Sequence, residues 1–201
     1  MKSSISLYIL ALATLIACQT DKQSSQHTEM PLGEEGIPDM SIYHLPDSWT
    51  TQHGDSISFV DLKGDPLVVV MIYTACRTAC PRLVADMRQI EQKVIKETEQ
   101  SVKYVLVSID PENDTPEKLL KFAEENGMHG EQWLFLRGTK DGVREFANIL
   151  SVKYKKINPI DFSHSNIISV FDAQGVLKYQ KEGLGLENNE IVKHVASIAG
   201  N

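Results

Sequence analysis

The sequence is poor in cysteine, has no cluster of basic residues, and has no hydrophobic run long enough to span a bilayer. Only three cysteines occur among its 201 residues, and the formal net charge is -7. No lysine- and arginine-rich run with interleaved aromatic residues occurs, so a nucleic-acid partner is not expected, because phosphate binding requires positive charge. Glycine and proline are not in excess, and 42% of the residues are hydrophobic. This composition predicts one globular domain of ordinary size.

The N-terminal segment has the features of an export signal. Lys2 is followed by an apolar stretch over residues 5–17, which is shorter than the roughly 20 residues of a transmembrane helix but suits a signal peptide. The stretch ends in LIAC, which resembles a bacterial lipobox with Cys18 as the lipidated residue. The alternative is a generic signal peptide that contains a cysteine. We expect a lipoprotein signal peptide over 1–17, a flexible tether over 18–40 and a folded domain over 41–201, anchored to a membrane of the cell envelope and facing the periplasm.

Export limits what the other cysteines can do. With Cys18 used by the anchor, only Cys76 and Cys80 remain for the folded domain. Outside the cytosol, a nearby thiol pair tends towards a disulfide unless it is kept reduced or binds a metal. A disulfide that closes so short a loop contributes little stability. The pair therefore indicates redox or metal chemistry rather than a structural crosslink.

Strand and helix patterns alternate through the domain. Residues 67–73 (LVVVMIY) are a continuous apolar run, typical of a strand buried on both faces. Residues 81–96 carry apolar side chains at helical spacing, and Thr115 and Pro116 suit the start of a second helix over 116–126. Further strands are expected at 56–62, 102–109, 133–137, 166–171 and 176–180, and further helices at 140–150 and 191–198. This order predicts an α/β fold of the thioredoxin-like type, a central mixed β-sheet flanked by helices on both faces.

The segment 73–81 (YTACRTACP) joins the first buried strand to the first long helix. In open α/β sheets, ligands bind at this edge, beyond the carboxyl ends of the strands. The helix N-terminus and Arg77 both supply positive charge, which lowers a thiol pKa and favours the thiolate that attacks disulfides or binds metal. The three-residue spacing places Cys80 one helical turn from Cys76. Two thiolates held together in this way suit Cu(I) or Zn(II).

A site built on two thiolates needs a further ligand, and six histidines are available. His164 is distinguished by its place in a loop just before the strand that opens the C-terminal hairpin. In a thioredoxin-like topology this loop lies beside the cysteine loop, so His164 is the expected third ligand. No comparable argument singles out the other five, which are His27, His44, His53, His129 and His194.

Three motifs follow one another over nearly the whole domain. They are Cys76-x-x-x-Cys80-Pro81 after an apolar strand, VSIDPENDTPE over 107–117, and His164 before a strand that ends in FDAQG over 171–175. In these motifs, residues 42–185 resemble the Sco/SenC family of copper-binding thioredoxin-like proteins. The resemblance implies that Cys76, Cys80 and His164 bind copper, as Cu(I) or Cu(II), in assembly of the copper centre of cytochrome c oxidase. The implied partner is the copper-bearing oxidase subunit or another copper or thiol client, and the expected lipid anchor adds the membrane.

The chain departs from that family at two places. Family members often have Pro-Asp after the first cysteine, where this chain has Arg77 and Thr78. This change makes the loop more electropositive and favours thiolate redox chemistry. Ser163 precedes the histidine where the family often has aspartate. A carboxylate that orients the imidazole is therefore missing unless Asp161 takes that role.

Two functions fit these residues. A copper chaperone binds and transfers the metal through a Cys2His site without turning over a substrate. A thiol:disulfide oxidoreductase needs only Cys76 and Cys80 and reduces cysteines of a client such as an oxidase subunit. The two roles are compatible, because a reduced client is what accepts copper. A peroxidase is poorly supported, since the threonine or serine expected three residues before a reactive cysteine is absent, with Tyr73 and Arg77 at those places.

The acidic residues of the second motif allow two interpretations. Asp110, Asp114 and Glu117 could form a site for a hard cation. Acidic side chains at a helix start also interact favourably with the helix dipole. The second interpretation is favoured, because these residues lie where the second helix begins.

Overall fold

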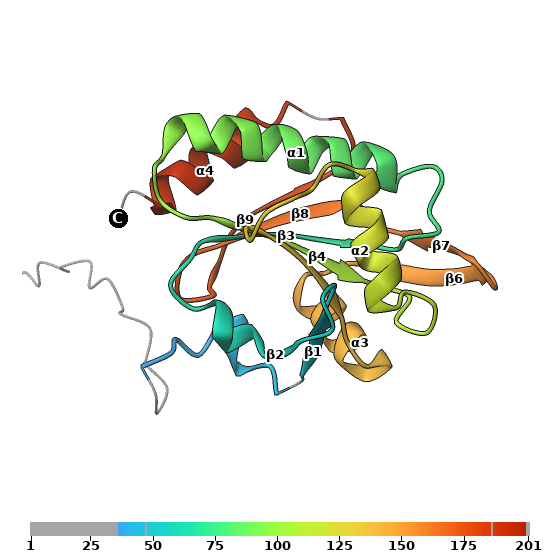
Figure 1. Ribbon diagram of the computed structural model, residues 1–201. Coiled ribbons are helices and arrows are strands. Elements are labelled where there is room, and N and C mark those ends of the chain that lie inside the picture. The colour runs from blue at the N-terminus through green and yellow to red at the C-terminus, as the bar shows by residue number, and fades with distance from the viewer. Residues whose placement is uncertain (1–35, 47, 186, 200–201) are drawn as a thin grey trace, which may run out of the picture.

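The strands with the most continuous apolar sequence form the centre of one mixed sheet. The computed structural model describes residues 36–46, 48–185 and 187–199, so the expected signal peptide, Cys18 and most of the expected tether lie outside the described residues. The strands are β1 (Trp49–Thr51), β2 (Ser56–Ile57), β3 (Leu67–Ile72), β4 (Lys103–Ser108), β5 (Trp133–Arg137), β6 (Tyr154–Asn158), β7 (Asp161–His164), β8 (Ile167–Phe171) and β9 (Leu177–Glu182). The sheet order is β2-β1-β5-β4-β3-β8-β9, and β6 and β7 pair separately (Figure 1).

The pairing of the central strands places one sheet edge beside the cysteines. β3 is buried along its whole length and pairs in parallel with β4 and antiparallel with β8. β4 pairs in parallel with β5. Because β3 and β4 run in the same direction, their carboxyl ends meet at the same edge, where ligands bind in open α/β sheets.

Helices cover both faces of the sheet. They are α1 (Cys80–Glu97), α2 (Pro116–Glu125), α3 (Lys140–Ile149) and α4 (Asn189–Ala199), with short 3-10 helices η1 (Ile42–His44) and η2 (Phe59–Leu62). α1 and α4 pack on one another above the sheet in Figure 1, α3 lies below it, and α2 contacts β5. This arrangement confirms the predicted thioredoxin-like fold, a mixed β-sheet with flanking helices.

The start and end of α2 follow the sequence signals. The side chain of Thr115 accepts a hydrogen bond from the backbone N–H of Lys118, and Pro116 occupies the first turn. The helix ends at Glu125, and Gly127 adopts a φ of +64°. A positive φ is readily adopted by glycine and terminates the helix.

Three elements differ from the sequence prediction. The strand expected over 56–62 is wrong beyond Ile57, because the Asp61 carboxylate accepts a hydrogen bond from the Ser58 backbone N–H at 2.7 Å and the chain turns into η2. The short strand β1 was not predicted, and neither was the β6–β7 hairpin, which contains the segment expected to be the loop of His164. Within the described ranges, no helix combines the length and apolar character that crossing a membrane requires.

Candidate metal centre

The cysteine loop leaves the end of β3 and leads directly into α1. The backbone N–H of Cys76 donates to the carbonyl oxygen of Tyr73 at 3.3 Å, which turns the chain just after the strand. Cys80 is the first residue of α1, and Pro81 follows it in the first turn. Cys76 therefore precedes the helix, and it is Cys80 alone that lies on it.

The two thiols are free, buried and inequivalent. The backbone N–H of Cys80 donates to Sγ of Cys76 at 3.2 Å. The hydrogen bond with the Cys80 thiol, the backbone N–H groups of Cys80 and Thr78, and the nearby Tyr73 hydroxyl lower the pKa of Cys76 to about 4, against the opposing effect of burial. The pKa of Cys80 is raised, because its proton is shared with Cys76 and its side chain is buried. The pair therefore holds one thiolate at neutral pH, on Cys76.

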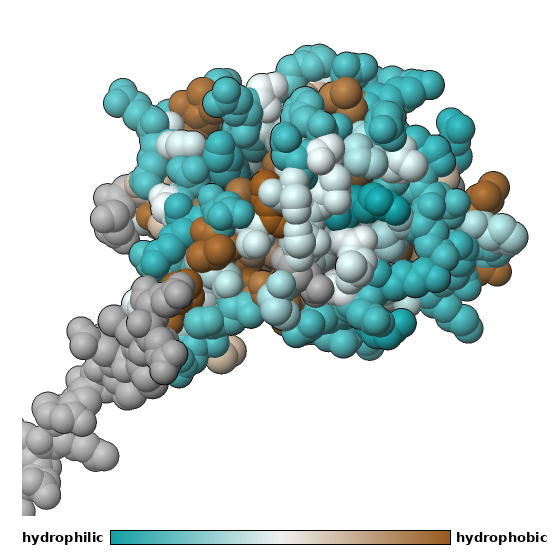
Figure 2. Space-filling model, turned by 60° about the horizontal axis from the view of Figure 1, so that its bottom comes forward, coloured by the Kyte–Doolittle hydropathy of each residue, from teal (hydrophilic) through white to brown (hydrophobic). Residues whose placement is uncertain are grey.

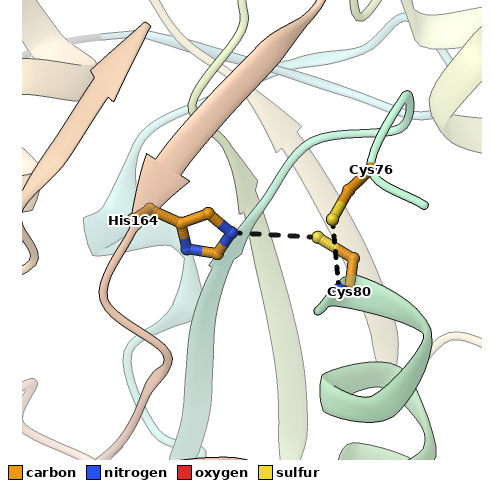
Figure 3. A group of neighbouring side chains, drawn as sticks. All are labelled: Cys76, Cys80 and His164. Atoms are coloured by element: carbon orange, nitrogen blue, oxygen red, sulfur yellow. Dashed lines mark hydrogen bonds between the residues drawn. The ribbon is translucent and has the colours of Figure 1, made fainter. Parts of the chain in front are cut away.

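His164 reaches the thiols from a different part of the chain. It is the last residue of β7 and faces Tyr154 across the hairpin, so it belongs to a strand rather than to the expected loop. Its Nδ1 lies 3.0 Å from the backbone oxygen of Ser165, and its Nε2 lies 4.0 Å from Sγ of Cys80 (Figure 3). A proton on Nδ1 satisfies the carbonyl and leaves the lone pair of Nε2 directed at the thiols.

The three side chains converge closely enough to share one metal ion. Their ligand atoms all lie within 4.8 Å of one another, and within the described part of the chain no other group of three or more histidine, cysteine or acidic residues does so. Metal–sulfur and metal–nitrogen bonds of about 2.3 and 2.0 Å place ligand atoms roughly 4 Å apart around a shared ion. Small side-chain adjustments thus suffice for coordination. Two thiolates and one imidazole favour a soft ion such as Cu(I) over Mg²⁺ or Ca²⁺.

Tyr73 connects the cysteine loop to the hairpin that carries His164. Its hydroxyl donates to the carboxylate of Asp161, and the backbone N–H of Phe162 approaches the same hydroxyl at 3.3 Å. The Tyr73 ring also packs edge-on against the His164 ring, with centroids 5.8 Å apart. The sequence suggested Asp161 as a carboxylate that could orient the imidazole. In the structure Asp161 instead accepts the hydrogen bond of the Tyr73 hydroxyl. It acts on the site through Tyr73, a residue whose role the sequence did not reveal.

Asp114 fixes the other side of the cysteine loop. Its carboxylate accepts hydrogen bonds from the backbone N–H and the hydroxyl of Thr74 and, at 2.6 Å, from the hydroxyl of Ser108 at the end of β4. Burial raises the pKa of Asp114, although these bonds oppose the shift. The carboxylate thus joins the cysteine loop to the second motif. A buried charged acceptor with these partners is structural.

The other acidic residues of the second motif are also engaged with protein groups. The side-chain amide of Asn113 donates to both carboxylate oxygens of Asp110, at 3.0 and 2.8 Å. Glu117 lies in the first turn of α2, as the helix-start interpretation expects. These contacts favour the structural interpretation over a site for a hard cation.

The remaining described histidines lie apart from the thiols. The Nε2 of His44 is 3.0 Å from the carbonyl oxygen of Pro38. The ring of His194 stacks on Tyr179, with centroids 4.1 Å apart. His27 lies outside the described residues. None of the described ones joins the cysteine pair, in agreement with the sequence-based choice of His164.

Comparison with known proteins places this site in a family. The family model described as SCO1/SenC matches residues 43–200. The SCO1 protein homolog of Bacillus subtilis is 34% identical over 117 residues, which are 57% of this chain and 60% of that relative, so the chain spans less than two thirds of its length.

Solved structures of similar fold include the following two. That of BsSco, described as a member of the Sco family of cytochrome c oxidase assembly proteins, is 27% identical with a TM-score of 0.69, covering 82% of this chain and 98% of that one. The copper-bound structure of Arabidopsis thaliana ScoI is 18% identical with a TM-score of 0.67, covering 75% of this chain and 93% of that one. With the family model matching most of the chain, and with two thiols and a histidine brought together at the sheet edge, the chain belongs to the SCO1/SenC family.

Proposed function

We propose that the protein is a copper chaperone that binds copper through Cys76, Cys80 and His164 and delivers it to the copper centre of cytochrome c oxidase. The observation that carries this proposal is the convergence of the three ligand atoms within 4.8 Å. Membership of the SCO1/SenC family supports it, and so do the copper bound to a family member of the same fold and the description of another as an oxidase assembly protein.

The electrostatics of the thiol pair suit capture of Cu(I). Cys76 is already a thiolate at neutral pH, since its pKa is about 4. The incoming cation replaces the proton that Cys80 shares with Cys76, and this proton passes to solvent. Because one positive charge is exchanged for another, the buried site keeps the single negative charge of the thiol–thiolate pair, and the attraction of the ion offsets the cost of ionising Cys80 there. His164 completes the set as a neutral ligand.

The site is open enough to exchange its cargo. His164 is half-buried and lines an open cavity of about 310 Å³ beside the hairpin. A ligand of a client can enter from this side and replace the imidazole first, while the thiolates hold the ion. Transfer is then a stepwise ligand exchange in which Cu(I) keeps its oxidation state and the freed thiolates regain one proton.

A second candidate is the thiol:disulfide oxidoreductase. The low pKa of Cys76 favours it, because a thiolate at neutral pH attacks disulfides readily. In that reaction Cys76 attacks a client disulfide, Cys80 resolves the mixed disulfide, and two electrons pass to the client. Arg77 beside Cys76 suits the same chemistry. This role requires both cysteines but leaves His164 without a function as a ligand.

The expected attachment completes the proposal. A lipid on Cys18, after removal of residues 1–17, would hold the domain at a membrane of the cell envelope on its periplasmic side. The tether over 18–40 would leave the domain free to meet membrane-bound clients. The observation that supports this placement is the LIAC segment.

Copper titration of the reduced, tag-free domain tests the proposal. We expect one Cu(I) per protein, and we expect His164→Ala to weaken binding by about tenfold or more in competition with a Cu(I) chelator. His44→Ala is the matched control and is expected to bind as the wild type does. Equal affinity of the wild type and His164→Ala contradicts the three-ligand site, whereas turnover of a disulfide substrate with no copper binding favours the reductase.

A further inference from the structure

The β6–β7 hairpin has an exposed apolar tip. Its tip carries Ile157 and Ile160, which are 64% and 70% exposed. Figure 2 shows apolar atoms, in brown, at the end of the molecule where Figure 1 places this tip. Large apolar side chains clustered on a projecting hairpin indicate an interaction site more than a solvated turn.

The hairpin is also positively charged in an acidic protein. Residues 153–165 contain Lys153, Lys155 and Lys156 against one acidic residue, Asp161, whereas the whole chain has a net charge of -7. Lys153 and Lys155 line the open cavity beside His164, together with Glu182 from β9. Any partner that reaches this cavity therefore meets a mainly basic wall.

The far side of the site carries positive charge as well. Arg77 is exposed in the cysteine loop, next to Cys76. Two acidic groups of the surrounding elements are engaged with protein partners. Asp161 accepts the Tyr73 hydroxyl, and Glu112 pairs with Lys140 at 2.6 Å. Basic side chains thus lie on the hairpin next to His164 and in the cysteine loop next to Cys76.

The base of the hairpin is held in place, so its tip is presented in a defined position. Lys156 lies 5.4 Å above the Phe162 ring and its Nζ is 3.9 Å from Oδ1 of Asp110. The Phe162 ring in turn packs on Tyr73, with centroids 5.2 Å apart. One face of the hairpin is therefore attached to the domain. A preorganised element costs less conformational entropy on binding than a loose loop.

We infer that the tip of the β6–β7 hairpin is the docking element for an acidic client protein, with Ile157 and Ile160 as the apolar anchors and Lys153, Lys155 and Arg77 as the charges that orient the client. The inference rests on the proposed function, because it takes the client to be the protein that receives copper. The hairpin carries His164 in its second strand, so a client docked at the tip contacts the same hairpin that supplies the candidate copper ligand.

A protein partner is favoured over the membrane surface. The described chain begins at Gly36, at the end of the molecule opposite the hairpin tip (Figure 1). The expected anchor therefore does not itself bring the tip to the lipid surface. The lysines beside His164 also border the cavity through which the cargo would leave, where a lipid headgroup would block transfer.

Binding of a defined probe tests the inference. The probe is the copper-free soluble domain of the copper-bearing oxidase subunit from the same organism, titrated with the Cu(I)-loaded protein. We expect the double variant Ile157→Ser/Ile160→Ser to raise the dissociation constant by about tenfold or more, because a few anchor side chains that become buried in a complex carry most of its binding energy. The matched control is Ile95→Ser/Ile149→Ser, at residues 65% and 43% exposed on α1 and α3, which is expected to bind as the wild type does.

A charge variant tests the orienting lysines. Lys155→Glu is expected to weaken binding several-fold at low salt and to reduce its dependence on salt, because screening acts on the charges that steer association. The control is Lys63→Glu, an exposed residue in the turn before β3, at the opposite end of that strand from the site.

The outcomes separate this inference from the proposed function. Equal binding of the tip variant and its control overturns the inference, as does a wild type that does not bind the oxidase domain. If the tip variant loses binding to vesicles of phosphatidylglycerol and phosphatidylcholine but still binds the oxidase domain as the wild type does, the inference is overturned in favour of the membrane. Copper stoichiometry, measured for every variant without a partner, tests the proposed function independently. If the wild type binds no copper while docking still depends on the tip, the chaperone role fails and the docking element stands.

Discussion

Replacement of Asp114 by alanine is expected to destabilise the domain and to loosen the cysteine loop together. The side chain is buried and accepts hydrogen bonds from Thr74 and Ser108, as described above. Ser108 is fully buried, so its hydroxyl loses its acceptor with no access to water. Leaving buried donors unsatisfied costs about 1–3 kcal/mol for each group. The partial exposure of Thr74 and the raised pKa of Asp114 reduce the total, since the charged carboxylate is itself disfavoured by burial.

The unsatisfied hydrogen-bond donors left by Asp114→Ala predict a loss of about 3 kcal/mol in the free energy of unfolding. For a domain of this size, 1 kcal/mol lowers Tm by roughly 2–4 °C, so the expected decrease is about 6–12 °C. Asp114→Asn keeps the volume and one acceptor oxygen and is expected to cost about half as much. The control is Glu117→Gln, which is exposed in the first turn of α2.

Urea unfolding of the reduced proteins, followed by circular dichroism, measures the stability. Alkylation of Cys76 in the folded state reports on the loop and is expected to be faster in Asp114→Ala, because Thr74 is released. A change below about 1 kcal/mol, or a lower stability with unchanged alkylation, refutes the view that Asp114 holds the cysteine loop.

Three further predictions concern single residues. The alkylation rate of Cys76 is expected to stay nearly constant from about pH 5 to 8, because its pKa of about 4 keeps it ionised throughout; a tenfold rise per pH unit contradicts the assignment. Tyr73→Phe is expected to shift that profile towards higher pH, since the hydroxyl stabilises the thiolate, and an unchanged profile removes Tyr73 from the site. Gly175→Ala is expected to lower Tm by several degrees, because Gly175 has a φ of +73° and an added Cβ would lie 2.6 Å from Oγ of Ser41; an unchanged Tm contradicts this strain.

The parts of the fold that could be predicted are those with a strong local signal. The apolar run of β3 fills the centre of the sheet, and Thr115 with Pro116 starts α2. β1 has only three residues, too few to show a period. In β6 one residue is half-buried and the rest are exposed, so no alternation of apolar and polar side chains marks it as a strand.

The candidate site divides in the same way. The spacing of Cys76 and Cys80 at a strand-to-helix junction and the family motif around His164 were sufficient to name the three side chains that converge. The contact between Tyr73 and Asp161 joins residues 88 positions apart. It depends on the register of a hairpin that the sequence did not predict, so sequence reasoning considered Asp161 only as a substitute for the missing carboxylate beside the imidazole. No local sequence pattern predicts which polar side chains pair over so long a separation in the chain.

X-ray absorption at the copper edge of the Cu(I)-loaded protein tests the central claim most directly. The account predicts two sulfur ligands at about 2.3 Å and one nitrogen ligand at about 2.0 Å, with the nitrogen contribution lost in His164→Ala and one sulfur lost in Cys76→Ser. Two sulfurs alone in the wild-type spectrum, or a nitrogen that persists in His164→Ala, would contradict the Cys2His centre.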